Sequence, residues 1–149
     1  MEAVILIGIQ ATGKSTFYRE RFFKSHMRIN LDMLKTRTRE NIFFDACIRA
    51  KQPFVIDNTN PSVEDRKKYI DASKEAGFTI IGYYFKSNIR EAIVRNEKRT
   101  GKEYVPSKGI ACTYNKLAIP TYDEGFDKLY YVNIDEDNNF IVQEWKNEF

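Results

Sequence analysis

The sequence predicts an α/β fold in which helices cover both faces of a mostly parallel sheet. Two observations indicate this fold class. Apolar runs of strand length alternate with segments of helical periodicity along the whole chain, as expected when crossover helices join parallel strands. The first apolar run also leads directly into a glycine-containing loop and a helical segment, from Gly8 to Thr16. At 149 residues, the chain is expected to form one domain, residues 1–149.

We expect a five-stranded, mostly parallel sheet with a further strand at its C-terminal edge. Each expected strand is a short apolar run bounded by turn residues or by a helical pattern. The run after Pro53 ends on a carboxylate, and the acidic run 135–139 is interpreted as a turn rather than as a calcium loop. The five strands are expected at 3–7, 27–30, 53–57, 78–85 and 129–134, with an antiparallel edge strand at 140–145.

Helices are expected between these strands, with capping residues at several of their starts. Asp32 is interpreted as the N-cap of a long helix that reaches Ala50, with Phe43, Cys47 and Ala50 facing the core, although its charged start leaves room for irregular backbone. Ser62 with Asp65, and Asn88, are predicted to cap later helices. The expected helices are 14–24, 32–50, 63–76, 89–99 and 107–118, the last two forming a small helical lid.

The composition is that of a water-soluble protein. Hydrophobic residues make up 42% of the chain and charged residues 30%, and no apolar run reaches the length of about 18 residues that spans a bilayer. We therefore expect a cytoplasmic protein without a membrane partner. The net charge of +3 permits an anionic partner without requiring one, and two cysteines with one histidine do not predict a zinc site. No feature indicates an oligomeric state.

The spacing G-x-x-x-x-G-K-S from Gly8 to Ser15 predicts a phosphate-binding loop. Its backbone N–H groups and the start of the next helix are suited to bind an anion, Lys14 to reach the outer phosphates of ATP, and the Ser15 hydroxyl to bind Mg²⁺. The strand before the loop and the helix after it provide the context that this motif needs. The residues predicted to bind the nucleotide are Gly8, Ala11, Thr12, Gly13, Lys14, Ser15 and Thr16.

Ligands of open parallel sheets bind beyond the carboxyl ends of the strands, which draws attention to the residues after the second and third strands. Asp32 follows the second strand and could accept the proton of an acceptor hydroxyl in phosphoryl transfer; its alternative role is the helix cap. Asp57 follows the third strand and could bind Mg²⁺; its alternative role is hydrogen bonding within the turn that continues through Asn58, Thr59 and Asn60.

Arg95 and Arg99 are four residues apart and share one face of a predicted helix. Guanidinium groups suit phosphate oxygens, so the two arginines could stabilise charge on a transferring group while the loop from Thr100 to Val105 closes over it. Glu91 lies four residues before Arg95, and an ordinary surface ion pair is the alternative.

Four segments in this order, GIQATGKST, RINLD, FVIDNTNPSVEDRKKYI and VRNEKRTGKEYVP, resemble the kinase domain of polynucleotide 5′-hydroxyl kinases. The resemblance extends from Val4 to about Gly125 and is greatest to the kinase half of polynucleotide kinase-phosphatases. It implies a P-loop kinase fold that uses ATP and Mg²⁺ to phosphorylate 5′-hydroxyl ends of DNA or RNA, an activity associated with nucleic acid repair.

The resemblance also implies roles for individual residues. Asp32 would be the general base, and Lys14 with the lid arginines Arg95 and Arg99 would bind and activate the ATP phosphates. Ser15 would bind the metal ion. Asp57 would bind the metal ion or the acceptor, and the remaining residues expected to contact the acceptor are Lys35, Asn58, Thr59 and Asn60.

One departure from the family pattern leaves the acceptor open. Leu31 stands where the family usually has an arginine beside the base, which keeps a small-molecule kinase for a nucleoside, sugar or nucleotide-sugar as the alternative. An ATP-binding regulatory NTPase is the third interpretation. Because the chain lacks the D-x-D-x-T signature, no phosphatase activity is expected.

Overall fold

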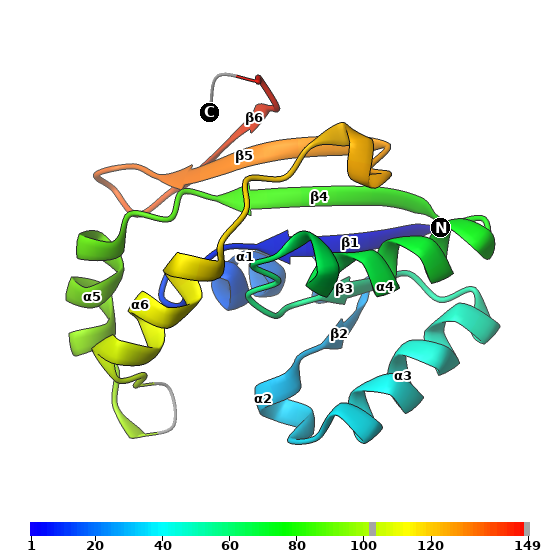
Figure 1. Cartoon of the computed structure of the whole chain (residues 1–149), viewed down its shortest axis with the longest axis horizontal. Coiled ribbons are helices and arrows are strands. Elements are labelled where there is room, and N and C mark those ends of the chain that lie inside the picture. The colour runs from blue at the N-terminus through cyan, green and yellow to red at the C-terminus, as the bar shows by residue number, and fades with distance from the viewer. Residues whose placement is uncertain (102–103, 148–149) are drawn as a thin grey trace.

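The computed structural model describes residues 1–101 and 104–147. Within them, six strands form one sheet in the order β2-β3-β1-β4-β5-β6, of which the first five are parallel and β6 is antiparallel to β5 (Figure 1). The predicted fold class, with an antiparallel edge strand at the C-terminus, is confirmed. The strands are β1 Glu2–Ile7, β2 Met27–Ile29, β3 Phe54–Ile56, β4 Thr79–Phe85, β5 Lys128–Ile134 and β6 Phe140–Glu144.

Helices cover both faces of the sheet, which is why the central strands are apolar on both sides. Residues Ala3 to Ile7 of β1 are fully buried. Their side chains alternate: Ile5 packs in the cluster with α3 and α4, and Leu6 packs in the cluster with α1. The helices are α1 Lys14–Arg21, α2 Leu31–Leu34, α3 Arg37–Ala50, α4 Val63–Glu75, α5 Ile89–Glu97 and α6 Ser107–Lys116, and a 3₁₀ turn occupies Tyr122–Glu124.

The expected helix from Asp32 to Ala50 is two helices, and Asp32 is not its N-cap. Asn30 caps α2 by accepting a hydrogen bond from Met33 N at 2.9 Å. Lys35 then adopts a positive φ of 76°, which ends α2, and the Thr36 side chain caps α3. The break falls in the charged segment where irregular backbone was anticipated, and it leaves Asp32 in the first turn of the short α2.

The core face of α3 also differs from the expectation. Cys47 is buried, but Phe43 is 45% exposed and Ala50 is exposed, whereas Phe44 and Ile48 pack on the core. The predicted caps at Ser62, with its capping box to Asp65, and at Asn88 are confirmed.

Helix α1 ends at Arg21, one turn before the expected Lys24. Phe22 is buried beside Phe17, and its N–H closes the helix on Tyr18 O at 2.8 Å. Residues 22–26 then turn toward β2, and Tyr18 Oη donates to His26 O at 2.7 Å, which ties the end of this turn to α1.

Helices α5 and α6 lie beyond the carboxyl ends of the central strands (Figure 1). Ala92 of α5 and Ile110 of α6 form a small apolar cluster with Ile9 and Ala11 of the glycine-containing loop. This packing places the two helices over that loop. Across the described residues, no helix combines the length and apolar character needed to cross a membrane.

Candidate functional site

The candidate site lies where the carboxyl ends of β1, β3 and β2 meet. The parallel register pairs Ile56 of β3 with Ile5 of β1 on one side and with Ile29 of β2 on the other. The segments that follow these three strands therefore leave the sheet side by side. These are the segments that the sequence selects: the loop after β1, the segment of Asp32 and the turn that starts at Asp57.

Two backbone N–H groups of the loop after β1 form hydrogen bonds with neighbouring segments. Gly8 N donates to Thr59 O at 3.0 Å, and Ile9 N donates to Ser87 Oγ at 3.2 Å. Gly13 has a φ of +93°, and a Cβ atom there would lie 3.0 Å from the Phe140 ring of β6. The position therefore requires glycine both for its backbone conformation and for its close approach to β6.

Lys14 is buried at the start of α1, and its ammonium group points back into the loop. Its Nζ donates to Gly8 O at 2.9 Å and to Ile9 O at 2.6 Å. Burial lowers the pKa of Lys14 to about 8, which Asp57 and Asp32 partly oppose and Arg99 reinforces. These three charged side chains therefore lie within electrostatic reach of Lys14.

Ser15, Asp57 and Arg28 form a closed set of hydrogen bonds beside the loop. Ser15 Oγ donates to Asp57 Oδ2 at 3.0 Å, and the Arg28 guanidinium donates to both, through Nε to Asp57 Oδ2 at 2.8 Å and through Nη2 to Ser15 Oγ at 3.0 Å. Asp57 is only 2% exposed. Arg28 is a site residue that the sequence analysis missed.

The Ser15 and Asp57 oxygens are suitable ligands for Mg²⁺, which prefers hydroxyl and carboxylate oxygen. Two protein oxygens do not complete an octahedral shell, and the described residues contain no group of three or more metal-binding side chains. The pair therefore fits an ion that takes its remaining ligands from phosphate and water, as Mg²⁺ does at nucleotide sites.

Asparagine side chains fix the segment that carries Asp32 to the end of β3. Asn30 Nδ2 donates to Asp57 O at 2.5 Å, and Asn58 Oδ1 accepts from Leu31 N at 2.8 Å. The Asp32 side chain is exposed to solvent. The backbone that carries Asp32 is thus held from both sides, while its carboxylate is free to meet a ligand.

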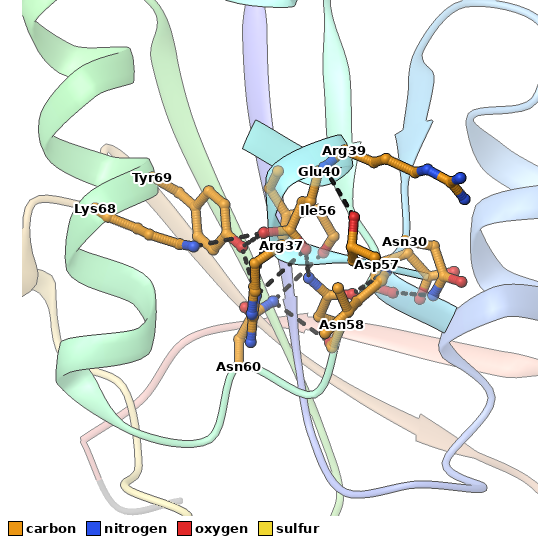
Figure 2. A network of polar contacts seen from close by, with 12 residues as sticks. Asn30, Arg37, Arg39, Glu40, Ile56, Asp57, Asn58, Asn60, Lys68 and Tyr69 are labelled. Carbon is orange, nitrogen blue, oxygen red and sulfur yellow. Dashed lines mark hydrogen bonds and ion pairs between the residues drawn. The ribbon is translucent and has the colours of Figure 1, made fainter. Parts of the chain in front are cut away.

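The buried carboxylate of Glu40 on α3 completes this support (Figure 2). Glu40 is fully buried and accepts hydrogen bonds from the Tyr69 hydroxyl, from Asn58 Nδ2 at 2.9 Å and from Arg37 Nη1 at 3.0 Å, with Lys68 Nζ 3.4 Å away. Burial alone would raise the pKa of Glu40, but the hydrogen bonds from Tyr69 and Asn58 and the two cations outweigh it, so the pKa is lowered. Glu40 therefore stays ionised and anchors Asn58.

The rest of the turn after β3 is also used within the protein. Asn60 is 4% exposed, has a positive φ of 46°, and donates through Nδ2 to Leu6 O at 2.7 Å. The backbone carbonyl of Asn60 accepts a hydrogen bond from the buried Arg66, which forms an ion pair with Glu124 at 2.8 Å. Thr59 contributes its carbonyl to Gly8 N. These contacts favour a positioning role for Asn58, Thr59 and Asn60.

A hollow of about 260 Å³ lies between the loop, the lid and the C-terminal hairpin. The lid arginines Arg95 and Arg99 line this hollow together with the loop residues Ala11, Gly13 and Thr16. The β5–β6 hairpin closes its far side with residues that the sequence analysis did not select. These are Ile134, Asn138 and Phe140.

The lid is anchored at its base. The Asn96 amide donates to Val105 O and accepts from Val105 N at 2.8 Å, and Gln10 Nε2 of the loop donates to Thr113 Oγ1 of α6 at 2.9 Å. Residues 102 and 103 of the expected closing loop lie outside the described residues. Lys35 is exposed at the break between α2 and α3, on the segment that bears Asp32.

Comparison with known proteins identifies a family and related sequences. The family description "AAA domain" matches residues 30–117, more than half of the chain. The bifunctional polynucleotide phosphatase/kinase of Schizosaccharomyces pombe is 29% identical over 137 residues, which cover 86% of this chain and 32% of that protein. The chain spans about a third of the length of the curated relatives it matches. The resemblance that the sequence motifs indicate is confirmed.

Two solved structures show the same fold at low sequence identity. Kti12 of Chaetomium thermophilum, in complex with ADP-AlF3, has a TM-score of 0.68 at 15% identity and covers 91% of this chain and 92% of that one. A gluconokinase of Sinorhizobium meliloti 1021 has a TM-score of 0.62 at 16% identity, with coverage of 89% and 82%. The chain thus has a P-loop kinase fold.

Proposed function

The chain belongs to the AAA domain family, and from that premise we propose that it is an ATP- and Mg²⁺-dependent kinase that phosphorylates the 5′-hydroxyl of DNA or RNA. The observation that carries the proposal is the placement of Asp32. Its carboxylate is exposed, lies within electrostatic reach of Lys14, and stands on a short helix that Asn30 and Asn58 fix to the end of β3. A phosphate loop alone would serve any nucleotide-binding protein, whereas a positioned base serves transfer to a hydroxyl.

The donor ATP would place its phosphates on the loop from Gly8 to Thr16. Its adenosine would extend toward the hollow that Arg95, Arg99 and Phe140 help to line. Lys14 and the two lid arginines would then stabilise the negative charge of the transferring phosphoryl group. The packing of Ile9 and Ala11 against α5 and α6 supports a lid that moves with the loop and excludes water.

The metal ion would be held by Ser15 and Asp57, the pair whose oxygens suit it. Bound Mg²⁺ supplies charge neutralisation to the outer phosphates of a nucleotide. The residues of the chain would do the rest: Asp32 would accept the proton of the 5′-hydroxyl as that oxygen attacks in line, and Lys35 would contact a phosphate of the acceptor strand.

The S. pombe relative carries polynucleotide kinase in its name, which supports this choice of acceptor. The alternative acceptor is a nucleoside, sugar or nucleotide-sugar. Leu31 favours it, because an apolar, half-buried side chain stands beside the base where a cation would assist a polyanionic strand. A regulatory NTPase is less well supported, since it would have no use for a positioned base at Asp32.

Transfer from γ-labelled ATP to a panel of acceptors separates the three activities. The panel contains single-stranded and duplex oligonucleotides with 5′-hydroxyl ends, matched oligonucleotides with 5′-phosphate ends as controls, nucleosides and sugars. We expect label on the 5′-hydroxyl oligonucleotides and none on the controls. Label only on small molecules would replace the proposal by its alternative, and release of phosphate without a labelled acceptor would indicate an NTPase.

A further inference from the structure

Arg28 has no part in the function proposed above, and yet its guanidinium contacts both groups assigned to the metal ion. It donates to Asp57 Oδ2 at 2.8 Å and to Ser15 Oγ at 3.0 Å. The contact with Asp57 is an ion pair. A charged guanidinium and a divalent cation compete for these two oxygens, because both bind through oxygen lone pairs and the two cations repel each other.

The position of Arg28 follows from strand pairing. Arg28 of β2 pairs with Val55 of β3, and side chains of register partners in a parallel pair leave the sheet on the same face. Asp57 follows Val55 by two residues, so its side chain leaves on that face too, where α1 begins with Ser15 next to Lys14. The guanidinium lies 6.0 Å from the ring centroid of Tyr18 on α1, which keeps it over this face.

Asp57 needs a counter-ion in the nucleotide-free protein. A carboxylate that is 2% exposed would be costly to bury without a partner, and Arg28 provides two charge-assisted contacts to the Ser15–Asp57 pair. The Arg28 side chain is itself 28% exposed, so it can turn away into solvent without uncovering the core. Asp57 is thus buried, whereas Arg28 is partly exposed to solvent.

We propose that Arg28 is an exchangeable counter-ion of the metal site: it occupies Ser15 and Asp57 in the free protein, excludes a divalent cation that arrives alone, and leaves when the cation arrives with a nucleotide. The proposal rests on the proposed nucleotide and metal site. Phosphate oxygens favour replacement of Arg28 by the metal ion, because they supply the further ligands that the two protein oxygens cannot provide. The free protein would therefore bind divalent cations weakly, and metal and nucleotide would bind together.

The direct test measures Mn²⁺ binding to the nucleotide-free protein by electron paramagnetic resonance. We expect Arg28→Gln to bind Mn²⁺ at least about tenfold more tightly than the wild type, since a charge-assisted competitor is removed. Adding Ser15→Ala to Arg28→Gln should abolish the gain. Arg49→Gln is the matched control, because Arg49 forms an exposed ion pair with Asp45 far from this pair. Equal affinity of Arg28→Gln and the wild type would overturn the proposal.

A second measurement uses the wild-type protein and does not depend on the folding of a variant. The Nε–H resonance of Arg28 should show slow solvent exchange in the free protein, persist when Mg²⁺ alone is added, and lose its protection when Mg²⁺ and ADP are added together. Retained protection with bound Mg·ADP overturns the exchange. Failure of Mg·ADP to bind at all would instead refute the nucleotide site, in which case the Mn²⁺ titration still decides the role of Arg28.

Discussion

Replacement of Glu40 by glutamine tests whether a buried carboxylate supports Asn58, which holds the segment that carries the proposed base. Glu40 accepts from the Tyr69 hydroxyl and from Asn58 Nδ2, and Asn58 in turn accepts from Leu31 N. Glutamine keeps the shape of the side chain but offers one acceptor oxygen and one NH₂ donor. Of the two uncharged donors that face Glu40, Tyr69 and Asn58, one must therefore lose its acceptor.

The magnitude follows from these contacts. A buried donor left without its acceptor costs about 1–3 kcal/mol, and the surviving bond falls from a charged to a neutral one, a loss of about 1 kcal/mol. The pairs with Arg37 and Lys68 add little, because those side chains are 56% and 46% exposed and can be hydrated. We expect Glu40→Gln to lower the free energy of unfolding by about 3 kcal/mol at neutral pH.

The effect should depend on pH. The pKa of Glu40 is lowered in the folded protein, so its contribution to stability is complete above the unfolded value of about 4.3 and is lost as the pH falls through the folded pKa. Glutamine does not titrate. The difference in the free energy of unfolding between wild type and variant should therefore be largest at neutral pH. It should decrease only at pH values below about 4.

Urea denaturation followed by circular dichroism measures both effects, with Glu20→Gln as the control, since Glu20 is exposed on α1. In a transfer assay the variant should lose kcat while its affinity for ATP changes little, because the loop from Gly8 to Thr16 keeps its own contacts. A variant as stable as the control would refute the reasoning, and so would a difference in stability that grows as the pH falls.

Three further predictions concern the loop and the base. Asp32→Asn should lower kcat by about 10²–10⁴-fold with the ATP dissociation constant unchanged, and near-normal turnover would remove Asp32 as the base. Nucleotide binding should take up protons between pH 8 and about 10, because phosphates raise the pKa of Lys14 from its lowered value of about 8; calorimetry in buffers of different ionisation enthalpy measures this uptake, and heats independent of buffer would contradict it. Gly13→Ala should weaken ADP binding in a thermal-shift assay far more than Gly101→Ala, because both glycines have a positive φ but only Gly13 lies against a ring; equal effects would contradict the contact with Phe140.

The features that the sequence predicted correctly are those that neighbouring residues determine. The strand, glycine-containing loop and helix from β1 to α1 follow from a continuous apolar run and a fixed motif. The caps at Ser62 and Asn88 follow from side chains that bond to the backbone three residues on. The order of strands and helices then predicts the parallel sheet.

The missed features depend on contacts between distant segments. Arg28 reaches Asp57 only through the register of β2 with β3, which a three-residue strand does not encode by itself. Glu40 looks like a first-turn acidic residue of α3, a common and exposed position, and Tyr69 looks like an ordinary core residue of α4. The hydrogen bond between Tyr69 and Glu40 depends on the packing of α3 and α4 on the same face of the sheet.

The turn from Asp57 to Asn60 illustrates what a distinctive motif does and does not specify. Asp57 pairs with Ser15 and Arg28, Asn58 joins Leu31 to Glu40, and Asn60 holds the end of β1. Every one of these side chains is engaged with the protein itself, so the motif maintains the spacing between the loop and Asp32 whatever the acceptor is. We therefore expect the choice of acceptor to depend on exposed positions near Asp32, of which Lys35 is a cationic one. Lys35→Ala should therefore weaken oligonucleotide binding and its salt dependence together while leaving ATP binding intact.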